Sequence, residues 1–302
     1  MRTAFLTIAV AALTVQAHPV KRDGGVDEYS RWDNPTDATV LNFALTLEHL
    51  ENAFYKGALA KFDDHAFIAA GLPSWARGRF AQVGAHEEAH VNFLSAALGD
   101  KATKPCTYKF PYTDPKSFAA LSQVLEGVGV SAYTGAARFI DNKDYLTAAA
   151  SVLATEARHA SWVAAAVNKG SGWSGALDVP LTLNTVFTLA ASFIESCPST
   201  NPALPVKAFP ALSFAKPAPG AASAVSFTST ADASTPLYAV YFTGLSQISS
   251  PIKGGKTTIP KGLQGVVYAV ISTSDTNAND QNIIAGPAIL DFPVGSDGKP
   301  RQ

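Results

Sequence analysis

The chain has 302 residues, of which 47% are hydrophobic and 16% are charged, and its formal net charge is −1. This composition suits one or two globular domains and is unlike that of a disordered chain. A chain so close to neutrality has no general electrostatic attraction for nucleic acid or for an anionic membrane, so we expect neither as a partner.

The N-terminal region carries the features of a secretory leader. An apolar run over residues 4–15 follows Arg2 and is followed by Gln16-Ala17. A basic start, a short apolar core and a small residue at the cut predict a signal peptide over residues 1–17. Residues 18–34 form an N-terminal segment. Within it, Lys21-Arg22 indicates proteolytic processing at a dibasic site at 21–22; alternatively, the two residues are simply solvated surface charges. The expected localisation is secreted or extracellular, with the cell wall as one destination.

Helical periodicity dominates residues 35–197. Four long helices are expected over residues 36–61, 73–98, 115–140 and 143–169, and a fifth over residues 180–196. Pro or Asp-Pro near a helix start and Gly or Pro after its end set these bounds. Helices of about 26 residues are longer than the usual length of about 11–12 and suit a four-helix bundle.

The connections indicate how the bundle is wound. The links over residues 62–72 and 141–142 can be short antiparallel turns, whereas the link over residues 99–114 is longer and contains several prolines. Sixteen extended residues reach about 50 Å, and a 26-residue helix is about 39 Å long. The long second-to-third link can therefore cross the full length of the bundle.

The remaining third of the chain has a different pattern. Residues 198–221 read as a Pro/Ala-rich linker, and residues 222–302 as a small β domain. Strands are expected over residues 224–230, 237–243, 265–273 and 283–292, which predicts a small antiparallel sandwich or barrel. This β region contains no histidine, cysteine or glutamate, so it offers no catalytic group of those types. It could pack on the bundle, form a homodimer or bind a cell-wall polymer, and the sequence leaves these alternatives open.

The chain has two cysteines, Cys106 and Cys197. Two are too few for a disulfide scaffold or a cysteine zinc site. In an oxidising compartment they are expected to pair and to tie the long link to the bundle, and two buried thiols are the alternative.

Two helices each contain a Glu-x-x-His motif, formed by Glu87 with His90 and by Glu156 with His159. Residues three apart share a helix face, so each motif presents a carboxylate and an imidazole together. On a helical wheel Glu87 and His90 fall within the apolar stripe formed by Trp75, Phe80, Val83, Phe93, Leu94 and Leu98. A buried carboxylate without a partner costs several kcal/mol, so such groups are normally paired or bound to metal.

The other two long helices carry a matching pair of motifs. Glu48 is followed seven residues later by Tyr55, and Glu126 is followed seven residues later by Tyr133. A carboxylate from each of two helices with Glu-x-x-His from the other two is the di-iron or di-manganese carboxylate pattern. Glu51 lies one turn after Glu48 and could share or replace its role.

Outside these motifs we expect His49 and His65 at the surface. His86 borders the buried face and could contact the ligand residues, with a purely structural role as the alternative.

Three sequence phrases resemble a known family. They are LNFALTLE at residues 41–48, TEARHA at residues 155–160 and TIPKGL at residues 258–263. They are similar to the secreted fungal stress-response and plant desiccation-related branch of the ferritin-like superfamily. The resemblance covers nearly the whole mature chain and implies a mainly α fold, in which a ferritin-like four-helix bundle precedes a small β-sandwich-like domain.

The same resemblance implies a site for two iron or manganese ions. Its ligands would be Glu48, Glu87, His90, Glu126, Glu156 and His159. Glu87 and Glu156 would bridge the ions, and Tyr55 and Tyr133 would donate hydrogen bonds to carboxylates across the bundle.

Two functional hypotheses follow. The first is oxidase-like or catalase-like chemistry on oxygen or peroxide at the dimetal site. The second is a non-catalytic secreted or wall-associated stress protein that keeps the bundle as a metal-binding or structural module.

Overall fold

The computed structural model describes residues 35–229, 231–232 and 234–299. The predicted signal peptide and the dibasic pair at 21–22 lie outside the described residues. Four long helices form the bundle: α1 (Asp37–Lys61), α3 (Ala76–Leu98), α4 (Pro115–Ala136) and α5 (Lys143–Trp162). The shorter helical elements are α2 (Asp64–Ala69), α6 (Leu183–Ala191), η1 (Gly99–Lys101), η2 (Ala137–Phe139) and the π-helical η3 (Val163–Val167).

Helix starts follow the local capping signals of the sequence. The side chains of Thr36 and Asn142 accept hydrogen bonds from backbone N–H groups in the first turns of α1 and α5. Asp114 and Ser117 form a reciprocal capping box at the start of α4, with Pro115 in its first turn. The predicted helix over residues 73–98 begins later, at Ala76, and α2 occupies part of the link that precedes it.

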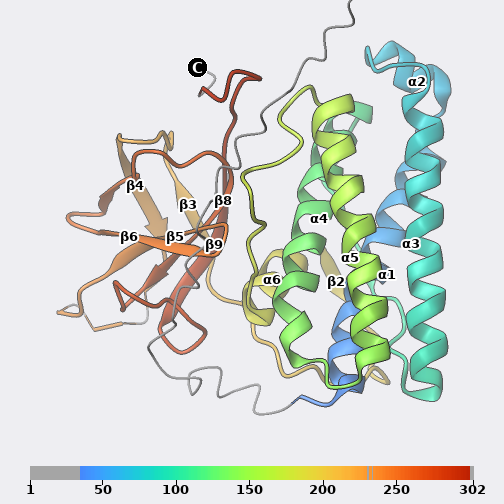
Figure 1. Ribbon diagram of the computed structural model, residues 1–302, viewed down its shortest axis with the longest axis horizontal. Helices are drawn as coiled ribbons and strands as arrows, with labels where there is room; N and C mark the ends of the chain where they lie inside the picture. The colour runs from blue at the N-terminus through green and yellow to red at the C-terminus, as the bar shows by residue number, and fades with distance from the viewer. Residues whose placement is uncertain (1–34, 230, 233, 300–302) are drawn as a thin grey trace, which may run out of the picture.

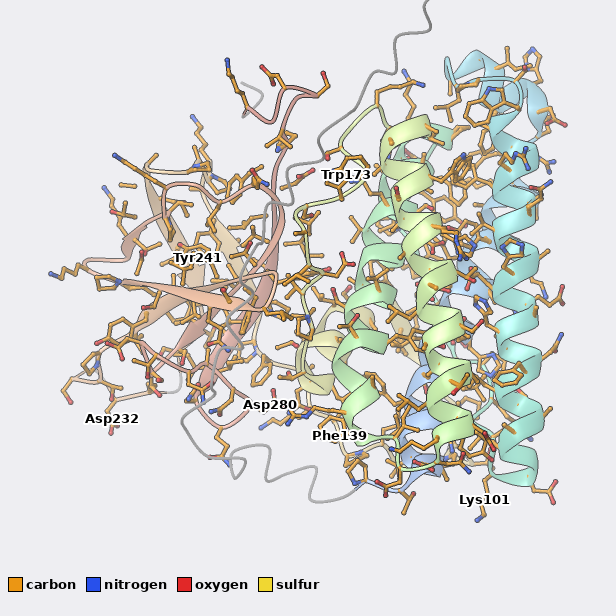
Figure 2. The ribbon with its side chains drawn as sticks, in the orientation of Figure 1. Lys101, Phe139, Trp173, Asp232, Tyr241 and Asp280 are labelled. Atoms are coloured by element: carbon orange, nitrogen blue, oxygen red, sulfur yellow. A yellow bond between two sulfur atoms is a disulfide. The ribbon has the colours of Figure 1, made fainter. Side chains whose placement is uncertain are left out.

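The long link between α3 and α4 crosses the bundle as predicted. Lys101 follows α3 and Phe139 follows α4, and both lie at the same end of the bundle (Figure 2). The link runs beside α1, because the backbone N–H of Thr103 donates to the Asn42 side chain and Tyr112 O accepts from Lys61 Nζ. The bundle therefore consists of two helical hairpins, α1 with α3 and α4 with α5, joined by one crossover (Figure 1).

A disulfide between Cys106 and Cys197 joins segments 91 residues apart, which confirms the predicted pairing. Next to it, β1 (Thr107–Tyr108) pairs antiparallel with β2 (Ile194–Ser196). This pairing explains why α6 (Leu183–Ala191) ends before the end of the helix predicted over residues 180–196. Its C-terminal residues leave the helix after Ala191 and extend to pair with the crossover link.

The C-terminal region forms two antiparallel sheets. A four-stranded sheet has the order β6-β5-β8-β9, formed by β6 (Ser246–Pro251), β5 (Tyr238–Thr243), β8 (Gly265–Ser272) and β9 (Ile283–Phe292). A three-stranded sheet has the order β3-β4-β7, formed by β3 (Leu212–Phe214), β4 (Ala222–Phe227) and β7 (Lys256–Thr258). Strands β3, β6 and β7 were not expected from sequence, and β3 lies within the segment read as a linker.

In the four-stranded sheet, β5, β8 and β9 are mainly buried on both faces, whereas the edge strand β6 is mostly exposed. Tyr241 and Val267 on one face pack in a core shared with the other sheet, whereas Val240 and Tyr268 on the opposite face join the core of the bundle. Because side chains alternate between the faces of a strand, both faces must be apolar, which accounts for the continuous apolar sequence of β5. The sheet region and α6 thus cover the α4 side of the bundle (Figure 1).

Two residues of the predicted apolar stripe, Trp75 and Phe93, are 45% and 47% exposed and mark its border.

Among the helices of the described residues, none is both long enough and apolar enough to cross a membrane.

Candidate metal centre

The four long helices bring six polar side chains to the middle of the bundle. Each helix supplies one glutamate, and α3 and α5 each add a histidine. The four carboxylates of Glu48, Glu87, Glu126 and Glu156 are fully buried, and His159 is 5% exposed. The His90 side chain is 12% exposed, so its edge reaches the surface. One helical turn separates glutamate from histidine on α3 and on α5, which aims each pair at the same interior point.

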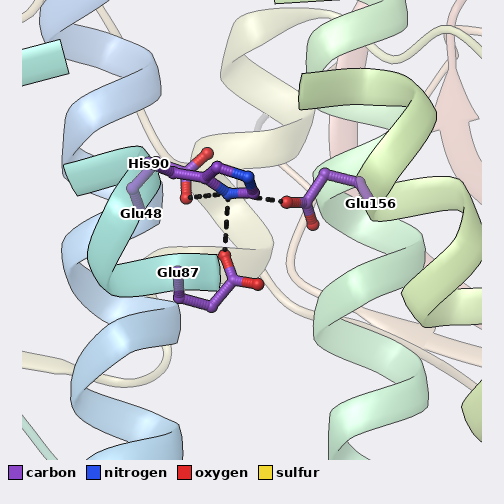
Figure 3. Close-up of side chains that lie close together, drawn as sticks. All are labelled: Glu48, Glu87, His90 and Glu156. Carbon is purple, nitrogen blue, oxygen red and sulfur yellow. Dashed lines mark hydrogen bonds and ion pairs between the residues drawn. The ribbon is translucent and has the colours of Figure 1, made fainter. Parts of the chain in front are cut away.

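His90 lies at the centre of one group of these side chains (Figure 3). Its Nδ1 atom is 3.3 Å from Glu48 Oε2, 3.2 Å from Glu87 Oε2 and 3.1 Å from Glu156 Oε1. These three carboxylates come from three different helices, α1, α3 and α5. His90 therefore contacts three carboxylates from helices that are far apart in the sequence.

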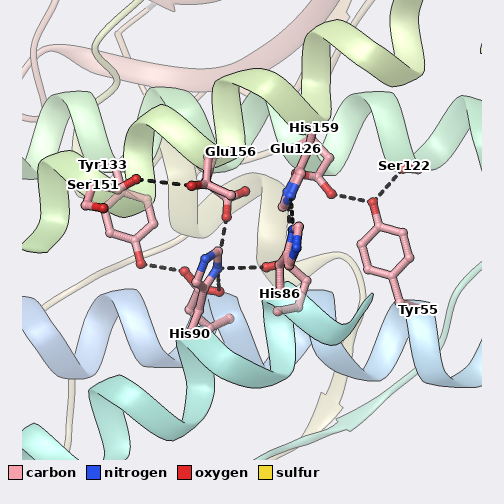
Figure 4. Close-up of polar contacts among 12 residues, drawn as sticks. Tyr55, His86, His90, Ser122, Glu126, Tyr133, Ser151, Glu156 and His159 are labelled. Carbon is pink, nitrogen blue, oxygen red and sulfur yellow. Dashed lines mark hydrogen bonds and ion pairs between the residues drawn. The ribbon is translucent and has the colours of Figure 1, made fainter. Parts of the chain in front are cut away.

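His159 forms the second group. Its Nδ1 atom is 3.2 Å from Glu87 Oε1 and 3.1 Å from Glu126 Oε2. Its other ring nitrogen, Nε2, is 2.9 Å from Nδ1 of His86, and the two rings stack (Figure 4). His86 is exposed, so it connects His159 to the surface on the α3 side. The sequence places His86 at the border of the buried face, where it could contact a ligand residue, and the structure identifies His159 as that contact.

Two sets of four residues have ligand atoms close enough together to hold a metal ion. In each set one atom per residue lies within 4.8 Å of the others; the sets are Glu48, Glu87, His90 and Glu156, and Glu87, Glu126, Glu156 and His159. Glu87 and Glu156 belong to both sets. The structure therefore brings all six sequence-predicted residues together, with two carboxylates placed between the two candidate positions.

Glu51 is placed differently from these six. It is buried, with 4% of its surface exposed, but it belongs to neither set. Burial and the nearby carboxylates, Glu156 foremost, raise its pKa well above the ordinary value. Glu51 therefore lies beside the centre, while Glu48 occupies the place on α1 within it.

Two tyrosines support the carboxylates from the opposite hairpin (Figure 4). The hydroxyl of Tyr133 on α4 donates to Glu48 on α1, and the hydroxyl of Tyr55 on α1 donates to Glu126 on α4. Ser122 lies 2.7 Å from the Tyr55 hydroxyl, whose hydrogen is given to Glu126, so Ser122 donates to it. This reciprocal arrangement reflects the repeated spacing of seven residues in the sequence. It fixes the orientation of two carboxylates whose other oxygens face the histidines.

Close approach of the helices depends on small residues. A Cβ atom on Gly84 of α3 would lie 3.0 Å from Cβ of Tyr55. Any side chain there would push α3 away from α1 and move the Tyr55 hydroxyl from Glu126. Gly84 is thus a packing requirement of the centre that the sequence motifs did not reveal.

Burial and mutual repulsion shift the ionisation of the carboxyl groups upward. Burial raises the pKa of Glu126, and burial with the charge of Glu126 raises the pKa of Glu156 well above its ordinary value. For Glu87, burial and the nearby Glu156 raise the pKa to about 7.

The histidines shift in the same direction. Burial lowers the pKa of His90, but contacts with Glu156, Glu48 and Glu87 outweigh it and raise the pKa to about 12. Burial likewise opposes protonation of His159, yet its contacts with Glu126 and Glu87 raise the pKa to about 10. When no cation is bound, protons held by these groups thus neutralise part of the carboxylate charge of the centre.

Hydrogen bonds within the protein leave the centre under-satisfied. Four oxygens are buried with no hydrogen-bond partner among the described residues: Glu48 Oε2, Glu87 Oε1 and both oxygens of Glu156. Nδ1 of His90 faces three carboxylates, but one ring nitrogen carries at most one hydrogen. Buried polar atoms normally have partners, so convergent carboxylate oxygens without one fit a bound cation. The donor set of carboxylates and imidazoles suits iron, manganese or zinc.

The remaining histidines have other surroundings. His65 is exposed, as expected. His49 was expected at the surface but is buried, and its Nε2 is 3.0 Å from the carbonyl oxygen of Thr103. The crossover link covers it, a tertiary contact that helical periodicity could not predict.

Comparison with known proteins agrees with this architecture. Residues 36–169 match the family model of the ferritin-like domain, a range that spans all four long helices and the six clustered residues. The chain is also similar to Protein rds1 of Schizosaccharomyces pombe, with 27% identity over 197 residues. That match covers 60% of this chain and 45% of the relative, so the chain spans less than half the length of the relative it matches.

Proposed function

Starting from the ferritin-like domain of residues 36–169, we propose that the protein binds two iron or manganese ions and reacts with oxygen or peroxide. The proposed ligands are Glu48, Glu87, His90, Glu126, Glu156 and His159. One observation carries the proposal: two candidate positions share Glu87 and Glu156, which is the arrangement that a dinuclear centre with bridging carboxylates requires.

The donor atoms support this choice of metals. Carboxylates and imidazoles suit iron and manganese, and thiolates that favour softer metals are absent because both cysteines are in the disulfide. Six side chains around two ions leave coordination positions for a small molecule. Bound iron or manganese would supply the electron transfer that reactions of oxygen or peroxide need.

The protein's own residues would prepare the site. Tyr133 and Tyr55 hold Glu48 and Glu126 by hydrogen bonds, so these carboxylates keep one orientation as charge changes nearby. His86 holds Nε2 of His159, which leaves Nδ1 directed at Glu87 and Glu126. Burial keeps bulk water away from the carboxylates of Glu48 and Glu126 and so strengthens their contacts with the tyrosines.

We also propose that the protein is secreted and belongs to the stress-response and desiccation-related branch that its sequence phrases resemble. The disulfide supports this, because disulfides persist in oxidising compartments. N-terminal sequencing of protein recovered from the culture medium would test the proposal. A start at or after residue 18 is expected, and protein found only inside the cell with residues 1–17 retained would contradict it.

Metal analysis tests the proposed centre. The native protein, reconstituted with ferrous iron or with manganese, should retain two ions per chain by elemental analysis. Glu87→Gln should lose most of this metal, because it removes a carboxylate shared by both positions. Glu88→Gln is the matched control, since Glu88 is the next residue on α3, is exposed and pairs with Lys56.

Turnover assays then separate the two functional hypotheses. Ferrous-iron oxidation and peroxide consumption should accompany metal in the native protein and in Glu88→Gln. Two bound ions without either activity would support a non-catalytic metal-binding module. No bound metal after reconstitution would contradict the proposed centre itself.

A further inference from the structure

A cavity of about 430 Å³ lies between the bundle and the C-terminal sheets, beside the proposed metal centre. Helices α1, α4 and α6 form its walls, and residues 208–212 and β9 close it on the sheet side. The segment that closes it is anchored, because the backbone N–H groups of Lys207 and Phe209 donate to side chains of α6. Most of the lining is aliphatic or aromatic, including Leu50, Val128 and Phe193. Its volume lies within the range of about 300–1,000 Å³ that is usual for small-molecule sites.

Glu51 is the only ionisable side chain among the described residues that line this cavity. It is 4% exposed and forms no hydrogen bond or ion pair with any described residue. Burying a carboxyl group without a partner is costly, and a buried polar group normally has one. An apolar cavity with one unpaired carboxyl group in its wall is therefore suited to a ligand that brings the missing polar partner.

The cavity and the metal centre meet at Gly129 of α4. A Cβ atom placed there would lie 3.2 Å from Glu51 Oε1 and 3.2 Å from Glu156 Oε2. Gly129 itself lines the cavity. The carboxyl group of Glu51 thus stands between the cavity and a proposed bridging ligand, and a molecule paired with Glu51 would lie one side chain away from the centre.

We propose that this cavity binds the organic substrate of the centre, an uncharged and mainly apolar molecule whose hydroxyl group pairs with Glu51. A hydroxyl group both donates and accepts, so it can pair with a carboxyl group in either protonation state. The aliphatic lining matches the rest of such a molecule, because burying apolar surface is favourable. That the ligand is a substrate rests on the proposed function, whereas its binding does not.

Binding of 1-octanol and of n-octane to the full chain tests the proposal by ligand-observed NMR and calorimetry. The native protein should bind one 1-octanol saturably. Ala190→Phe, which places a ring in the buried wall, should weaken binding at least tenfold. Glu51→Leu should weaken the binding of 1-octanol about tenfold and leave the binding of n-octane unchanged. Ala160→Phe is the control, because Ala160 lines a neighbouring cavity between α4, α5 and residues 171–179 and does not line this one.

Each outcome is decisive. Absence of saturable 1-octanol binding to the native protein would overturn the proposal, as would an equal loss in the Ala160 control. If circular dichroism shows that Ala190→Phe does not fold, Ala208→Phe replaces it, because Ala208 lines the same cavity and is exposed. Metal content measured on the same samples separates the two proposals. Octanol binding without metal would refute only the metal centre, and metal without octanol binding would refute only the cavity.

Discussion

Removing metal should leave a fold that becomes less stable as the pH rises. Glu87 is the best-defined contributor, since burial and Glu156 raise its pKa from 4.5 to about 7. That difference corresponds to about 3 kcal/mol, at about 1.4 kcal/mol for each pKa unit. A raised pKa means that the folded state holds the proton more tightly. The stabilisation is therefore complete below pH 4.5 and is lost as the pH rises through about 7.

The two histidines act in the same direction over a higher range. Their pKa values are raised from 6.5 to about 12 for His90 and to about 10 for His159. Their contributions are complete below pH 6.5 and are lost as the pH rises through about 10 and about 12. Between pH 5 and pH 8 every one of these shifts predicts falling stability of the metal-free protein.

Urea unfolding of chelator-treated protein, followed by circular dichroism from pH 5 to pH 8, measures this slope. Glu87→Gln should flatten it, because an amide cannot ionise, and should be more stable than the native protein at pH 8 without metal. Glu88→Gln should keep the native slope. Stability that rises with pH, or an unchanged slope in Glu87→Gln, would contradict a role of Glu87 in this pH dependence.

Three other predictions follow from the same contacts. Gly129→Ala should reduce metal retention measured by elemental analysis, because its Cβ would press on Glu51 and Glu156. Gly127→Ala should retain metal, because its Cβ would lie 3.9 Å from the nearest atom, the hydroxyl oxygen of Tyr268. Tyr55→Phe should weaken metal binding about tenfold in a chelator competition, because Glu126 loses a supporting donor, and an unchanged affinity would deny Tyr55 this role. Cys106→Ser with Cys197→Ser should lower the free energy of unfolding by about 4 kcal/mol, because the disulfide closes a long loop, and equal urea midpoints would contradict this.

The sequence was most informative where one helix carries its own signal. The two Glu-x-x-His motifs need only helical geometry to place Glu87 beside His90. The hydrogen bond from Tyr55 to a carboxylate of another helix was implied by the family resemblance. The four long helices followed from capping residues and periodicity. The crossover followed from the number of residues in the link.

The features that were missed depend on contacts between distant segments. Residues 212–214 form a strand because residues 225–227 pair with them, and three residues are too few to show a period. His49 is buried because the crossover link covers it. The tyrosine spacing favoured Glu48 over Glu51 but left Glu51 as a possible substitute. Only the packing of α4 and α6 separates the metal centre from the cavity wall.

Anomalous diffraction from crystals grown with iron or manganese is the sharpest test of the dinuclear centre. Two metal peaks about 4 Å apart are expected. One peak should lie among Glu48, Glu87, His90 and Glu156, and the other among Glu87, Glu126, Glu156 and His159. A single peak, peaks elsewhere in the molecule, or none after loading would contradict the dinuclear centre.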